Sequence, residues 1–286
     1  MENFKDKTMD LHIHSNISLG GTLGVEEILA KAQKEKVDVI AITDNNSALA
    51  NVVLQHIDIS KYYKGTVIAG AEIDAVSEGL TFEVLAYNFN IHPVQNWLYY
   101  KYATVEIRQA RIRDKLIALA EKKGFKLDKD FPWNYKKEFG HVNVWNNIKR
   151  FPQNLKLLGN AKIVEERDFY RYATTDKKFP LYVNLSNLWT DIKEVVNVIH
   201  NNGGIVILSH PYGYRKEMDV DKLLSIAKKN NVDGIEVYNP KHSKEQQQYL
   251  LDFAKKHNML IGGGSDFKSP KEGQTSLPFA KIKNLL

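Results

Sequence analysis

Short apolar runs recur along the chain, and each ends at a polar or ionisable residue. The runs have the length and the β-branched content of buried strands, and they lie at residues 37–42, 66–69, 204–208, 234–238 and 259–263. Continuous apolar runs are typical of parallel strands that are covered on both faces. The pattern therefore predicts an α/β barrel whose polar side chains gather where the strands end.

Helical patterns alternate with these strands. We expect helices at residues 26–32, 107–122, 192–200, 223–229 and 245–257. Thr22 is the expected N-cap of the first of them. The stretch from about 125 to 185 breaks the alternation and has no clean period. We therefore predict a single domain over residues 1–286 with a mainly helical insertion, at approximately 100–185, that covers the active-site mouth.

The composition narrows the possible chemistry. The chain has 286 residues, of which 43% are hydrophobic and 26% charged, as expected for a soluble globular protein. It contains no cysteine, so any metal must be held by His, Asp and Glu. Residues 1–7 lack the apolar core of a signal peptide, and no apolar run approaches the ~20 residues of a membrane span. A cytoplasmic protein without a membrane partner is the expectation.

The net charge of the chain is +6, with a pI near 9.1. The basic residues are spread along the sequence, which favours a lysine-rich solvated surface and argues against long nucleic acid as a partner. A net positive field would still attract a small anion. The charge is therefore consistent with a phosphorylated small molecule or a nucleotide as substrate.

Two histidines indicate a metal site. His12 and His14 are two residues apart at the end of an apolar run, so in a strand both imidazoles would face the same side. A solvated strand face is the alternative interpretation of this pair. Metal-capable residues at other strand ends favour a metal, and they are Asp44, Glu72, His210 and Asp266.

These motifs resemble the PHP family, the polymerase and histidinol phosphatase superfamily, and most closely its stand-alone phosphoesterase branch. The matching segments follow the family's order and are Asp10-Leu-His12-Ile-His14-Ser15, Ala41-Ile42-Thr43-Asp44, Gly70-Ala71-Glu72, Ser209-His210-Pro211, Ile235-Glu236-Val237-Tyr238-Asn239-Pro240 and Gly264-Ser265-Asp266-Phe267. The resemblance implies a distorted (β/α)7-type barrel with metal ions at the strand ends. It also implies hydrolysis of phosphate esters.

The resemblance assigns ligands for two metal ions. The first ion would be held by His12, His14, Glu72 and Asp266, all of which are present. The second would share Glu72 and use His210, with Glu83 in place of a family histidine and His92 as a rival to Glu83. We therefore expect one or two divalent ions, with Zn, Mn or Fe compatible with these ligands.

Three positions depart from the family pattern. Leu19, Asn45 and Lys268 stand where relatives carry the ligands of a third metal ion. Because all three are changed together, the resemblance implies that this one site is lost. The Lys268 ammonium could replace part of the missing positive charge at a substrate phosphate; a plain surface lysine is the alternative.

We predict a hydrolase that cleaves a small phosphomonoester or a nucleotide-type phosphodiester with a metal-activated water. The alternative is a catalytically degenerate PHP domain that binds a ligand or a protein. Candidate catalytic groups are Lys268, His242 and Asp44. Candidate substrate-binding groups are His141, Arg108, Arg111 and Arg215.

Overall fold

The computed structural model describes residue 4 and residues 6–184, 188–214, 218–270 and 282–283. Its chain forms two compact units. The first, here called the barrel unit, contains Met1–Lys101 and Thr190–Leu286, and the second, the helical unit, contains Tyr102–Trp189. The prediction that an insertion covers the mouth of the barrel stays a prediction.

A single sheet organises the barrel unit. Its strands are β1 (Met9–Ile13), β2 (Val39–Ile42), β3 (Thr66–Ser77), β4 (Leu80–Tyr87), β5 (Thr190–Asp191), β6 (Ile205–Leu208), β7 (Gly234–Tyr238) and β8 (Leu260–Gly263). The order is β1-β2-β3-β4-β6-β7-β8, and the short β5 pairs with β3. Neighbouring strands are parallel except where β4 lies antiparallel to both β3 and β6.

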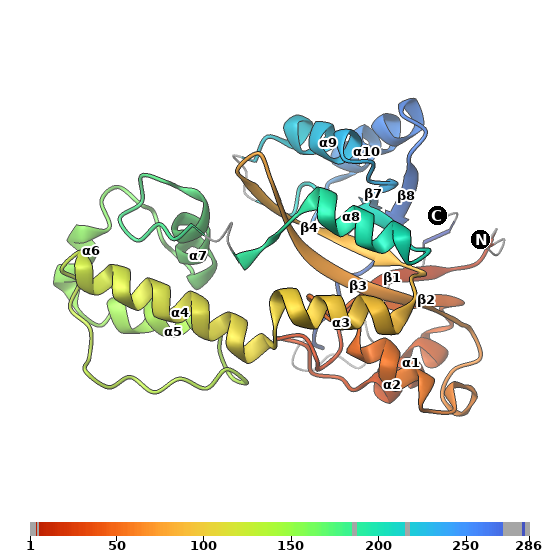
Figure 1. Cartoon of the computed structure of the whole chain (residues 1–286), viewed down its shortest axis with the longest axis horizontal. Helices are drawn as coiled ribbons and strands as arrows, with labels where there is room; N and C mark the ends of the chain where they lie inside the picture. Colours follow the sequence, from red (N-terminus) through yellow and green to blue (C-terminus); the bar gives the residue numbers. More distant parts are fainter. Residues whose placement is uncertain (1–3, 5, 185–187, 215–217, 271–281, 284–286) are drawn as a thin grey trace. The chain divides into compact units, whose positions relative to one another are not determined.

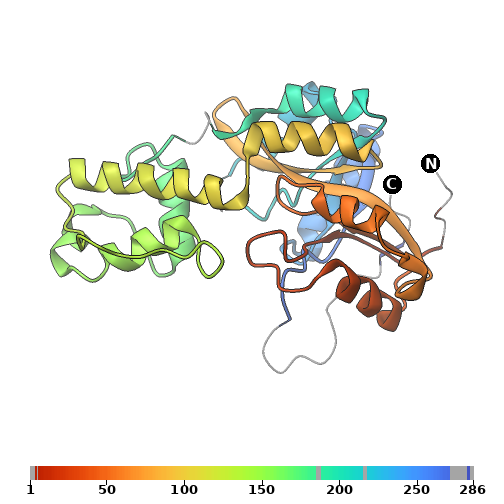
Figure 2. The same cartoon turned by 60° about the horizontal axis from the view of Figure 1, so that its bottom comes forward.

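The sheet curls until its outer strands approach each other, with helices packed around it (Figures 1 and 2). One face of the strands forms a buried apolar core of Met9, Leu11, Val39, Ala41, Ile68, Leu85, Tyr87 and Ile207. Beyond β1, the backbone N–H of His14 donates to the carbonyl of Phe267 at 2.8 Å, in the segment after β8. The predicted α/β class with a distorted barrel is confirmed.

Helices connect the strands of this unit. They are α1 (Val25–Glu35), α2 (Leu49–Gln55), α3 (Ile91–Tyr102), α8 (Ile192–Asn201), α9 (Val220–Lys229) and α10 (Lys244–Lys256), with a 3₁₀ turn at Ile59–Lys61. Ser243 starts α10 by accepting the N–H of Gln246, a standard N-cap arrangement. The prediction of Thr22 as the first cap is wrong, because the residue that precedes α1 is Gly24, whose N–H donates to Glu27.

The antiparallel pair of β3 and β4 departs from the parallel pattern that the sequence predicted. Strand β3 continues past Ala69 to Ser77, and the chain then reverses through Glu78 and Gly79. Both turn residues have a positive φ, 48° and 78°, which is the backbone that a two-residue hairpin turn requires. The hairpin brings Glu83 alongside Asp74 of β3.

The helical unit is built from α4 (Val105–Lys122), α5 (Gly140–Ile148), α6 (Pro152–Leu157) and α7 (Glu166–Thr175). Thr104 begins α4 by accepting the N–H of Ile107 at 3.3 Å. The unit has its own apolar core, with Leu116, Phe169 and Leu181 at its centre. In the described part of the chain, no helix is both long and apolar enough to cross a membrane.

Closure of the barrel generates a stability prediction at Gly264. A Cβ at this position would lie 2.4 Å from the backbone nitrogen of His12, so Gly264→Ala forces β1 and the end of β8 apart. We expect a loss of about 1–3 kcal/mol in the free energy of unfolding, measured by chemical denaturation. Gly24→Ala is the matched control, because its Cβ meets only ordinary contacts, and it should cost only about 0.5 kcal/mol, the lower end of the cost of alanine at an N-cap. Equal stability of the two variants would contradict the close approach of Gly264 to the backbone of His12.

Candidate metal centre

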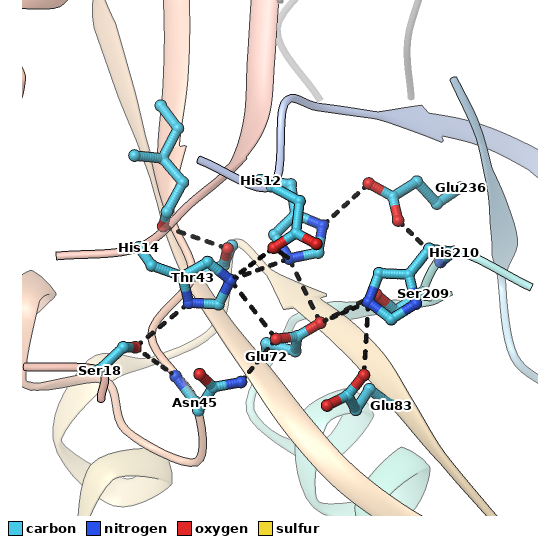
Figure 3. Close-up of polar contacts among 12 residues, drawn as sticks. His12, His14, Ser18, Thr43, Asn45, Glu72, Glu83, Ser209, His210 and Glu236 are labelled. Carbon is cyan, nitrogen blue, oxygen red and sulfur yellow. Dashed lines mark hydrogen bonds and ion pairs between the residues drawn. The ribbon is translucent and has the colours of Figure 1, made fainter. Parts of the chain in front are cut away.

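The strand ends bring potential metal ligands together from distant parts of the chain. His12 lies on β1 and His14 directly after it, whereas Glu72 lies in β3 and His210 follows β6. The potential ligand atoms form three groups, each within 4.8 Å: His12, His14 and Glu72; His12, His210 and Asp266; Glu72, Glu83 and His210. Glu72 is common to two of these groups, and Figure 3 shows it between His12, His14 and His210.

The first pair of imidazoles converges closely. The Nε2 atoms of His12 and His14 lie 3.2 Å apart. The Glu72 carboxylate is 3.3 Å from Nε2 of His12 and 3.5 Å from Nε2 of His14. The Asp266 carboxylate is 3.2 Å from Nε2 of His14 and 3.6 Å from Nε2 of His12. Four donor groups therefore surround one point.

A second point of convergence lies on the other side of Glu72. Nε2 of His210 is 3.3 Å from a Glu72 oxygen and also 3.3 Å from a Glu83 oxygen. Glu83 reaches this point because the β3–β4 hairpin places it on the neighbouring strand. His92, the rival to Glu83, is exposed on α3.

Glu236 orients two parts of the site. Its carboxylate lies 2.9 Å from Nδ1 of His12 and accepts the backbone N–H of His210 at 2.7 Å. A carboxylate partner at Nδ1 places the proton on that nitrogen, so the Nε2 lone pair of His12 faces the cluster. Sequence reasoning missed this role, although Glu236 is the one charged residue within the otherwise apolar strand β7.

Asp44 orients His14 through a serine. Its carboxylate accepts the hydroxyls of Ser15 and Ser18, each at 2.6 Å. Because Ser18 gives its proton to Asp44, its oxygen accepts from Nδ1 of His14 at 3.2 Å. The Nε2 lone pair of His14 is therefore also directed at the cluster. Asp44 acts on the histidine through Ser18.

The donor set fits divalent cations. Two imidazole lone pairs 3.2 Å apart repel each other unless a cation lies between them, and the adjacent carboxylates add negative charge. Burial lowers the pKa of His12, but Glu236, Glu72 and Asp266 outweigh it and raise that pKa well above its ordinary value. Burial and the nearby Glu72 raise the pKa of Glu83 to about 7. The carboxylates therefore favour a positive charge at the His12 imidazole, which a proton or a metal ion can supply.

Proton donors stand at two of the departed family positions. The Asn45 side-chain amide donates to Glu72 at 2.6 Å. The Lys268 ammonium lies 3.7 Å from an Asp266 oxygen. Leu19, the third departed position, is a partly buried apolar side chain. An amide and an ammonium donor therefore face carboxylates of the cluster.

Lys241 is a further cation at the cluster that sequence reasoning missed. Its ammonium is 2.5 Å from Asp266, and its side chain is 35% exposed, close to the 41% of Lys268. His12 and Glu72 are at most 2% exposed, whereas Glu83 is 30% exposed. Solvent therefore reaches the cluster along the side formed by Glu83 and the two lysines.

Neither His242 nor Asp44 belongs to the three ligand groups. Asp44 is bound to the hydroxyls of Ser15 and Ser18. His242 lies beside β7. Nδ1 of His242 donates to the carbonyl of Val237 at 2.9 Å, and its ring meets Tyr212 edge-on. Burial lowers the pKa of His242, so the imidazole is neutral. This geometry describes a buried histidine held by the backbone of β7.

The predicted substrate-binding residues have the following surroundings in the structure. His141 is buried in the helical unit beside Phe139 and Tyr170, and burial lowers its pKa to about 4. Arg108 donates to the carbonyl of Ala103 at 3.0 Å. Arg111 is exposed on α4. Arg215 lies outside the described residues.

Comparison with known proteins defines the family. The model of the PHP domain matches residues 10–260. A 5'-3' exoribonuclease of Haemophilus influenzae is 28% identical over 272 residues, which cover 92% of this chain and 91% of that protein. A 3',5'-nucleoside bisphosphate phosphatase of Chromobacterium violaceum is 28% identical over 118 residues, covering 41% of this chain and 40% of its own.

The fold agrees with this match. A solved structure from Bifidobacterium adolescentis, described as a metal-dependent phosphoesterase, superposes with a TM-score of 0.66 at 19% identity. The alignment covers 98% of this chain and 92% of that one. The chain therefore belongs to the PHP domain family.

The role of Glu236 generates a prediction. Glu236→Gln leaves a single acceptor oxygen for two donors, the His12 ring and the His210 backbone, so His12 loses its fixed orientation. We expect the dissociation constant for Mn²⁺ to rise by about 10–100-fold in calorimetric titration, with an unchanged circular dichroism spectrum. Glu245→Gln, on the exposed start of α10, is the control and should bind Mn²⁺ normally. If Glu236→Gln binds Mn²⁺ as tightly as the wild type, Glu236 does not orient His12 for metal binding.

Proposed function

We propose that this protein is a metal-dependent phosphoesterase that cleaves a small phosphomonoester or a nucleotide-type phosphodiester. The observation that carries the proposal is the position of Glu72, whose carboxylate lies within 3.5 Å of the Nε2 atoms of His12, His14 and His210. One carboxylate between two ligand groups is the arrangement of a dinuclear hydrolase. The named activities of the exoribonuclease and phosphatase relatives support the same class.

The cofactors proposed are one or two divalent ions, with Zn, Mn or Fe suited to mixed imidazole and carboxylate ligands. His12, His14, Glu72 and Asp266 would hold the first ion, and Glu72, Glu83 and His210 the second. Such ions supply a Lewis acid for the phosphoryl oxygen and an activated water as nucleophile. Glu236 and Ser18 hold the two histidines ready for this task before any ion binds.

The chain's own cations would receive the phosphate. Lys241 and Lys268 both point at Asp266 on the solvent-facing side of the cluster. We propose that these two ammonium groups turn to the substrate phosphate, bind its oxygens and stabilise the charge of the leaving oxygen. Their positive charge would then replace part of that of the third metal ion that the family resemblance implies. Asp44 serves in this scheme as a positioning residue for His14.

The substrate need not be small. The expectation that excluded long nucleic acid is not supported, since relatives that cover nine-tenths of the chain are named exoribonucleases. A terminal phosphate on a nucleotide or on an oligonucleotide presents the same group to Lys241 and Lys268. We therefore propose nucleotide-type phosphate esters of either length as substrates. His141, Arg108, Arg111, Arg215 and His242 stay predicted contacts.

A binding module without catalysis is the second candidate. Asn45 and Lys268 place proton donors on Glu72 and Asp266, and this favours the loss of at least one metal position. If the loss extends to turnover, the lysines and the remaining ligands form a phosphate-binding pocket. The two candidates differ in hydrolysis and agree in metal binding.

Metal content and hydrolysis measured together test the function. The wild-type protein loaded with Mn²⁺ should hydrolyse a 5'-phosphorylated dinucleotide or a nucleoside bisphosphate, and EDTA should abolish the activity. Glu72→Ala should lose all bound metal by elemental analysis, because it removes the shared ligand. Glu83→Ala should keep one ion, because the group of His12, His14 and Glu72 is intact. Bound metal without hydrolysis of any phosphate ester would instead establish the binding module.

The lysines generate a separate prediction. Lys268→Ala should lower kcat by about 10²–10³-fold, as for other single electrostatic groups, and leave the metal content unchanged. Lys241→Ala should have an effect of the same direction, because its ammonium lies even closer to Asp266. Lys256→Ala, exposed at the end of α10, is the control. Wild-type turnover in both active-site variants would show that they are surface lysines.

A further inference from the structure

Charge divides unevenly between the two units. The helical unit, Tyr102–Trp189, contains 18 lysines and arginines against 10 aspartates and glutamates, a net charge of +8. The remainder of the chain contains 22 against 24, a net charge of −2. The basic character of the protein therefore belongs to the unit that lacks the metal ligands. The basic residues are spread along the sequence, but the acidic residues that balance them are fewer in the helical unit.

One segment of the helical unit combines this charge with aromatic rings. Residues 129–137, here called the aromatic loop, contain Phe131, Trp133 and Tyr135 at alternate positions. All three side chains are partly exposed, and the rings of Trp133 and Tyr135 meet edge-on at a centroid distance of 6.5 Å. Residues 130–134 form neither helix nor strand. The three rings thus lie close together in sequence on one irregular segment that ends in a turn at residues 135–137.

Cations accompany these rings. The Arg113 guanidinium of α4 lies 4.7 Å from the Phe131 ring centre and 5.8 Å from that of Trp133. The Lys136 ammonium lies 5.9 Å from the ring centre of Tyr135. Arg113 is fixed in place, because its Nε donates to Asn143 at 2.8 Å and its Nη2 to the carbonyl of Phe131 at 3.0 Å.

Three lysines of the loop are available to an outside anion. Lys129, Lys136 and Lys137 are all exposed. The ion pairs described in this unit join Arg113 to Asp114 and Arg150 to Asp128, so they use none of these lysines. Exposed cations beside partly exposed rings match a polymer that carries phosphates and flat bases.

We propose that the aromatic loop binds single-stranded RNA, with bases stacked on Trp133 and Tyr135 and phosphates contacted by Lys129, Lys136 and Lys137. The inference rests on the proposed phosphoesterase function for the choice of RNA among polyanions. Stacking requires unpaired bases, so a duplex of the same sequence fits the loop less well.

A matched pair of charge reversals tests the surface in the full chain. The probe is a fluorescent, 5'-phosphorylated single-stranded oligoribonucleotide with phosphorothioate linkages that resist cleavage, and binding is read by fluorescence anisotropy. Lys136→Glu combined with Lys137→Glu should weaken binding by at least about tenfold. Lys255→Glu combined with Lys256→Glu makes the same change of charge at the exposed end of α10 and should have a much smaller effect. Equal weakening by both pairs would overturn the proposal.

Ring variants test the stacking. Trp133→Ala should weaken single-strand binding by about tenfold, and Trp133→Phe should restore most of it, because it keeps a ring. Tyr135→Ala gives an independent measurement should the tryptophan variant unfold. Equal affinity of the wild type for single strand and duplex, or tighter binding to anionic lipid vesicles than to RNA, would overturn the assignment.

Turnover of a small substrate separates this inference from the proposed function. The lysine and ring variants should hydrolyse a nucleoside bisphosphate at the wild-type rate, because the loop carries none of the metal ligands. If the wild type binds RNA but cleaves no phosphate ester, the proposal of an RNA-binding loop is supported and the proposal of a phosphoesterase is contradicted. If the wild type cleaves the bisphosphate but does not bind RNA, the phosphoesterase is supported and the RNA-binding loop is contradicted.

Discussion

The rest of the barrel unit depends on the electrostatic balance around Glu72. This buried carboxylate faces three imidazoles, and burial alone would raise its pKa. His12 and the other histidines reverse this effect and hold the pKa of Glu72 well below its ordinary value. Removing either kind of group leaves the other buried without a partner, which is costly. The cluster therefore requires all of its members, or a cation, to be present together.

The surrounding structure fixes where the lone pairs of these imidazoles point. Glu236 acts directly on His12, and Asp44 acts on His14 through Ser18. Both carboxylates lie on the far side of the rings from Glu72, so they direct each Nε2 towards it. Asp266 completes the group with a left-handed backbone, φ 50°, a conformation that costs energy and is concentrated at functional sites.

The departures from the family pattern alter one side of the cluster. Asn45 and Lys268 donate protons at two positions where the family resemblance implies metal ligands, and Lys241 adds a second ammonium. Positive charge on flexible side chains can follow a substrate phosphate, whereas a metal ion is fixed by its ligands. The barrel unit has a net charge of −2, although Lys241 and Lys268 lie next to its metal ligands, and the helical unit carries the excess of positive charge.

The sequence by itself determined the fold class and the set of residues from which the site is built. Runs such as 234–238 and 204–208 became strands because continuous apolar β-branched segments are stable only when buried in a sheet. The spacing of His12 and His14 indicated a shared target because alternate residues of a strand face the same side. The hairpin that carries Glu83 was missed, because its turn residues Glu78 and Gly79 form no strong hairpin signature.

Tertiary structure decided which of these residues meet. Glu236 reaches His12 across 224 positions of sequence, and Lys241 reaches Asp266 from a loop after β7. No local pattern encodes such contacts, because they arise only when the sheet curls and β1 approaches the segment after β8. The division of charge was already present in the sequence, yet it acquired meaning only when the fold showed where one unit ends and the other begins.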